Sequence, residues 1–78
     1  MPAELLPLEL LKTGELAEVA DVTGEPGWVT RLAELGVRIG SQLRVLQAGS
    51  PCLLQVGECR LSLRSDWATQ ILVRPVTM

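Results

Sequence analysis

Two cysteines are the side chains of this sequence that are best suited to bind a soft metal ion. The chain contains no histidine, the residue that most often ligates transition metals and most often acts as a general base. Cys52 and Cys59 are separated by six residues, unlike the C-x2-C pairs of structural zinc sites. We therefore expect no resident cofactor, with weak transition-metal binding at Cys52 and Cys59 as the alternative.

The two cysteines lie in or beside strands predicted at residues 53–56 and 59–63, which a two-residue turn with glycine first would join. If Val56 pairs with Cys59, then Cys52 pairs with Leu63 and both thiols share one apolar face. They would be about 13 Å apart along the strands, whereas a disulfide needs Cα atoms within about 7 Å. We expect both cysteines in the core. The alternatives are one reactive surface thiol or a metal-binding pair.

Carboxylates are spread along the chain without a D-x-D-type cluster. We expect them on the solvated surface, with a hard-cation site as the alternative; they include Glu15, Glu18, Asp21, Glu25, Glu34, Glu58 and Asp66. Neither a G-x-x-x-x-G-K-[ST] nor a G-x-G-x-x-G phosphate loop occurs. With histidine also absent, the sequence predicts a protein that is not an enzyme.

Charge and hydropathy narrow the classes of partner. The net charge is −2 and the arginines are scattered singly, which argues against nucleic acid. The apolar runs are far shorter than the roughly 20 residues that cross a bilayer, and the N-terminus has no basic segment before an apolar one. We expect a cytoplasmic protein without direct membrane insertion.

The elements that position these residues begin with a helix at residues 27–35, which places Trp28, Leu32 and Leu35 on one face. Trp28 is its expected anchor. Gly36 is predicted to end the helix in the left-handed region, so that Val37 folds back onto the last turn. Gly40 then opens a strand at residues 41–46.

The remaining pattern predicts short strands. Residues 15–22 form a strand if a bulge near Ala20 and Asp21 keeps Val22 in phase. Ser65 can cap a helical turn at residues 66–70, and a last strand at residues 71–74 ends at Pro75. With 78 residues and 47% hydrophobic content, the chain is predicted to be one domain, residues 1–78, with a core of leucine and valine. Five short strands suit a small barrel, of SH3 or OB type.

Three motifs occur in order: L-x-x-L-K-x-G-E at residues 8–15, R-L-x-E-L-G-x-x-x-G at residues 31–40, and L-S-L-R at residues 61–64. In this the chain resembles the FeoA family, small cytoplasmic partner proteins of bacterial ferrous-iron transport. The resemblance implies a mainly β fold: a small SH3-like barrel of about five strands, with one inserted α-helix and a short helical turn before the last strand. The motif residues are Gly14, Arg31, Leu32, Glu34, Leu35, Gly36, Gly40, Leu63 and Arg64.

The resemblance also implies a function, namely an interaction module that binds the cytoplasmic region of the ferrous-iron permease, a membrane GTPase. A transition-metal sensor or delivery protein is the alternative, because iron-dependent repressors contain related SH3-like domains. Two departures stand out. The linker before the central hairpin is short, at residues 48–51, and Trp67 replaces a residue that is usually polar. Trp67 has a packing partner at Ile71, but we expect it to be the main contact with the permease.

Overall fold

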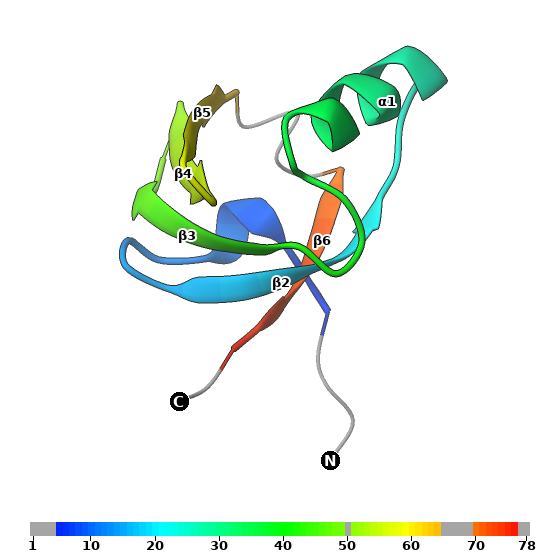
Figure 1. The fold of residues 1–78 in the computed structure, drawn as a ribbon. Helices are drawn as coiled ribbons and strands as arrows, with labels where there is room; N and C mark the ends of the chain where they lie inside the picture. The colour runs from blue at the N-terminus through cyan, green and yellow to red at the C-terminus, as the bar shows by residue number, and fades with distance from the viewer. Residues whose placement is uncertain (1–4, 50, 65–69, 77–78) are drawn as a thin grey trace.

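The structure is a computed structural model that describes residues 5–49, 51–64 and 70–76. These residues form one antiparallel sheet that curls around the core, in the order β1-β6-β2-β3-β4-β5 (Figure 1). The strands are β1 (Leu6–Pro7), β2 (Leu16–Val22), β3 (Gln42–Gln47), β4 (Cys52–Val56), β5 (Cys59–Leu63) and β6 (Ile71–Pro75). The 3-10 helix η1 (Leu8–Leu10) follows β1, and the α-helix α1 (Pro26–Glu34) lies between β2 and β3. The predicted mainly β fold is confirmed, with the two-residue β1 as an additional strand.

The bulge in β2 occurs where the alternation required one. The register between β2 and β6 shifts between Val19 and Asp21, which leaves Ala20 as the extra residue. Ala17 and Val19 are buried before the bulge, and Val22 packs against the core after it. A single inserted residue thus keeps both ends of β2 in contact with the same core.

Helix α1 begins and ends one residue earlier than predicted and stops at a Schellman motif. Gly36 has φ +102°, its N–H donates to Ala33 O at 3.0 Å, and the Val37 N–H donates to Leu32 O at 2.8 Å. Val37 is therefore turned back into the core. Leu35, predicted on the buried face with Trp28, is instead 40% exposed, because it follows the last helical residue and its position is fixed by the cap.

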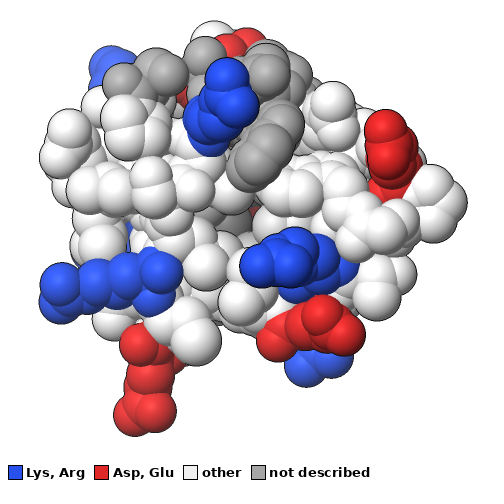
Figure 2. All heavy atoms as spheres, turned by 90° about the horizontal axis from the view of Figure 1, so that it is seen from above, with Lys and Arg blue, Asp and Glu red and all other residues white. Residues whose placement is uncertain are grey.

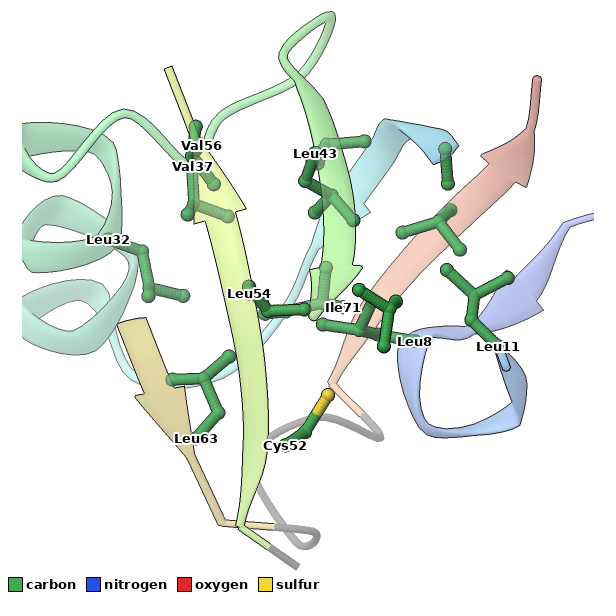
Figure 3. Packing of buried hydrophobic residues seen from close by; sticks show 14 residues of the cluster. Leu8, Leu11, Leu32, Val37, Leu43, Cys52, Leu54, Val56, Leu63 and Ile71 are labelled. Carbon is green, nitrogen blue, oxygen red and sulfur yellow. The ribbon is translucent and has the colours of Figure 1, made fainter. Parts of the chain in front are cut away.

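Leucine and valine supply most of the core, as the composition predicts. Figure 3 shows Leu32 pointing into it from α1, and Cys52 and Leu54 pointing into it from β4. Among the described residues, no polar or charged side chain is buried. The buried set is Leu8, Leu11, Ala17, Val19, Leu32, Val37, Leu43, Val45, Cys52, Leu54, Val56, Leu63, Ile71 and Val73. The sequence pattern predicts no element before residue 15, whereas Leu8 and Leu11 close one side of this core.

The hairpin of β4 and β5 has the predicted register. Val56 pairs with Cys59 and Cys52 with Leu63, around the turn residues Gly57 and Glu58. A type II′ turn requires a positive φ at its first central residue and not at its second. Gly57 meets this requirement with φ +60°, and the φ of Glu58 is not positive. The predicted Ser65 cap, the helical turn that begins at Asp66, and Trp67 lie outside the described residues.

Candidate functional site

An apolar groove runs between α1 and the end of β2. It has a volume of about 330 Å³, and the described part of its lining comprises Val22 on β2, Val29 and Ala33 on α1, and Val37, Arg38 and Ile39 in the following turn. Ile39 is 70% exposed, the largest fraction among the exposed large hydrophobic residues of the described chain. A groove that is almost wholly apolar and open to solvent is typical of a surface that binds another protein.

Local structure fixes the shape of this groove. Val29 and Ala33 are four residues apart, so they lie on the same side of α1. The Schellman motif turns Val37 inward, and the next turn is held by the Ser41 N–H, which donates to Arg38 O at 2.9 Å. Gly40, with φ +94°, donates its N–H to Val19 O at 2.8 Å. Ile39 is therefore presented to solvent from a tightly bonded turn.

Charge is sparse around the groove. Among the described residues that line the groove, Arg38 is the single charged one. On the face shown in Figure 2, the described basic and acidic side chains are interspersed with uncharged ones, and no continuous basic patch forms. This distribution suits a protein partner that contributes apolar side chains rather than a nucleic acid.

The two cysteines occupy different environments. Cys52 is buried, and removal from water raises the pKa of its thiol. The prediction that Cys59 is also buried is wrong, because its side chain is exposed. Alternation along a strand identifies the face of a residue but not its depth, and along β5 the inward positions pass from buried Leu63 through half-buried Leu61 to exposed Cys59 at the turn.

The cysteines are therefore not brought together. Both are free, and they lie at opposite ends of the hairpin register. Among residues 5–49, 51–64 and 70–76, no group of three or more cysteine, aspartate or glutamate side chains could hold a metal ion. The described carboxylates form no hard-cation cluster either, and the Glu18 Oε1 atom accepts from Arg74 Nη1 at 2.8 Å, whereas Asp66 lies outside the described residues.

The motif residues serve mainly to build the fold. Leu32 and Leu63 are buried, and the Gly14 N–H donates to Val45 O at 2.7 Å, which ties the turn before β2 to β3. The exposed members of the motifs are Gly14, Arg31, Glu34, Leu35, Gly40 and Arg64. Trp67 lies outside the described residues.

The groove itself was not anticipated from the sequence. Its available signals were Val29, which the helical pattern places beside the core face, and Ile39, an isoleucine among the three residues that lie between two glycines. Neither signal distinguishes an exposed apolar residue from a buried one, because exposure depends on the hydrogen bonds that hold the turn after α1.

Comparisons with known proteins agree with the fold. The sequence matches the FeoA domain family over residues 6–75. A FeoA protein from Chlorobium tepidum is 33% identical, with 92% of this chain and 71% of that chain covered and a TM-score of 0.87. FeoA from Stenotrophomonas maltophilia, crystallised with zinc and described as an SH3-domain protein, is 32% identical, with 85% and 86% covered and a TM-score of 0.74.

A manganese-dependent transcriptional repressor shares the fold at 21% identity, over 97% of this chain and 44% of its own, with a TM-score of 0.85. Among curated proteins, none matches this chain. No helix among the described residues has the length and apolar character needed to cross a membrane.

The curled antiparallel sheet, its single α-helix and these likenesses define the class as a small SH3-like domain. The chain belongs to the FeoA family, which is associated with ferrous iron transport.

Proposed function

We propose that this protein is an accessory module of bacterial ferrous-iron uptake that acts on the cytoplasmic side by binding the membrane GTPase that serves as the iron permease. The family membership supplies the transport system. The observation that carries the proposal is the apolar groove beside α1, with Ile39 exposed at its rim. The module would act by surface complementarity, without chemistry of its own.

The groove suits an apolar anchor from the partner. Its walls are aliphatic, so insertion of a leucine, isoleucine or phenylalanine side chain would remove apolar surface from water on both partners. Ile39 would be covered at the same time. Since interface energy is concentrated in a few well-covered residues, Ile39 and the partner's anchor are expected to carry much of it. Trp67, the main contact that the sequence predicts, remains proposed alongside the groove on the sequence argument alone.

A pull-down of the permease's cytoplasmic region, with and without guanine nucleotide, tests this proposal. Ile39→Asp places a charge at the groove rim and should lower the affinity at least about 30-fold, the effect of a hot-spot residue that loses about 2 kcal/mol. Leu10→Asp is the matched control, because Leu10 is 60% exposed on η1, which lies apart from α1 in Figure 1. It should bind like wild type.

Circular dichroism must show that each variant remains folded. Absence of capture by the wild-type protein in both nucleotide states would contradict the proposal. Equal losses with Ile39→Asp and Leu10→Asp would contradict the groove as the contact surface. Trp67→Ala tests the Trp67 contact separately, with an expected loss of about 2 kcal/mol or more, which is at least about 30-fold.

A further inference from the structure

The two edges of the sheet differ in how they are protected. β1 has two residues and ends at Pro7, which has no backbone N–H to offer a further strand. β5, at the opposite edge, has five residues, contains no proline and pairs with β4 without a register shift. Within the described parts of the chain, no backbone hydrogen bond outside the strand ladders reaches β5. Natural edge strands are protected by short length, bulges, prolines or charged side chains. Of these features, β5 has only a charged side chain.

The register shows which backbone groups of β5 face outward. A two-residue turn is closed by a hydrogen-bonded pair, here Val56 and Cys59, and such pairs alternate with non-hydrogen-bonded ones. Arg60 and Ser62 occupy the intervening positions opposite Gln55 and Leu53. Their N–H and C=O groups therefore point away from β4, toward the open edge.

The side chains of β5 also alternate. Arg60 and Ser62 are exposed on the outer face, where Arg60 continues a cross-strand row from Arg44 on β3 and Gln55 on β4. Leu61, half-buried, points toward the core side. An added strand would thus meet a positive charge on its outer face and an apolar residue on its inner face.

We infer that β5 is a docking edge for an extended acidic segment of a partner protein, which adds to the sheet as an antiparallel strand with alternating acidic and apolar residues. This mode of recognition combines backbone hydrogen bonds with side-chain pairs. A second copy of this chain is disfavoured as the occupant. Symmetric pairing about Leu61 would set each Arg60 diagonal to the Arg60 of the other copy, and like charges at such positions repel.

The test uses a seven-residue, end-capped peptide of alternating glutamate and valine, titrated into the ¹⁵N-labelled protein in about 0.15 M salt, where remote charges are screened. The matched peptide has lysine in place of glutamate. We expect the glutamate peptide to bind at least about fivefold more tightly than the lysine peptide, because glutamate attracts Arg60 across the edge whereas lysine repels it. The largest amide shifts and slowed exchange are expected at Arg60 and Ser62.

Two further peptides test the backbone. In an antiparallel strand, the glutamate opposite Arg60 would direct its own N–H toward β5, and the valine N–H groups would point away. N-methylation of the glutamates should therefore abolish binding, whereas N-methylation of the valines should leave it within about twofold. The inference is overturned if both methylated peptides lose binding equally, or if neither loses it. This comparison leaves the protein unaltered.

Charge variants complete the test. Arg60→Glu should lose the preference for the glutamate peptide and favour the lysine peptide. Arg44→Glu makes the same change in the same row but two strands away, and should shift the affinity less than about twofold. The inference fails if the wild type binds no peptide, binds both equally, or shows its shifts in the groove beside α1. It also fails if β5 is protected in a concentration-dependent dimer without peptide.

Discussion

At the scale of single residues, Gly36 carries a backbone conformation that a side chain would strain. Its φ is +102°, and an added Cβ would lie 3.3 Å from Val56 Cγ1. Gly36→Ala should therefore lower the free energy of unfolding by about 1–3 kcal/mol. Urea unfolding followed by circular dichroism measures this loss.

Gly27→Ala is the matched control for that change. Gly27 lies within α1, has no positive φ, and has nothing within 4 Å of an added Cβ. The same substitution should be neutral or stabilise by up to about 1 kcal/mol, because alanine is the better helix former. Equal effects at the two glycines would show that the left-handed cap does not determine the stop of α1.

At the scale of elements, η1 contains a leucine in the core and a leucine in solvent within one turn. Leu8 is fully buried and Leu10 is 60% exposed. Leu8→Ala should cost about 2–5 kcal/mol of unfolding free energy, the range for a buried leucine, and Leu10→Ala less than about 0.5 kcal/mol. Thermal unfolding of the two variants compares them directly. Similar melting temperatures would mean that η1 does not close the core.

The elements differ in how far the sequence predicts them. The β4–β5 register, the bulge at Ala20 and the glycine stop after α1 were predictable, because each depends on local alternation or on a positive φ. β1 and η1 were missed because the leucines between residues 5 and 11 fit two periods at once. Leu6, Leu8 and Leu10 alternate as in a strand, whereas Leu8 and Leu11 have the i, i+3 spacing of a helix face. Their burial depends on contacts with distant strands, such as the pairing of Leu6 with Val73.

The candidate surfaces were less predictable than the fold. Exposure of Cys59 and Ile39 depends on where the core ends, which a one-dimensional pattern does not contain. Trp67 could be singled out by residue type and by the resemblance, but the groove required the bonded turn at residues 38–41. The edge at β5 likewise follows from the strand order, not from the composition of the strand.

At the scale of the whole molecule, burial of Cys52 couples folding to alkaline pH. Burial raises its pKa in the folded state above the ordinary value of 9.0. The unfolded chain therefore loses this proton at lower pH than the folded chain, so stability falls as pH rises above the ordinary value. The fall continues up to the raised pKa, by at most about 1.4 kcal/mol per pH unit for one proton.

Urea unfolding under reducing conditions at pH values from 8 upward measures this slope. The chain has no tyrosine, and Lys12 is its single lysine, so few other groups titrate in this range. Cys52→Ala should flatten the slope, whereas Cys59→Ala, at an exposed position, should retain it. A slope unchanged in Cys52→Ala would assign the alkaline dependence to another group.

The pairing of β1 with β6 brings the first and last strands of the sheet side by side, with Leu6 opposite Val73. Chain entering at β1 and chain leaving from β6 therefore pass the domain on the same side, and Figure 1 shows α1 and β5 on the other. Further polypeptide can be joined to such a domain at both ends, while the groove and the docking edge on the opposite side stay accessible. The repressors that share this fold have longer chains, of which the match covers 44% in one and 36% in another.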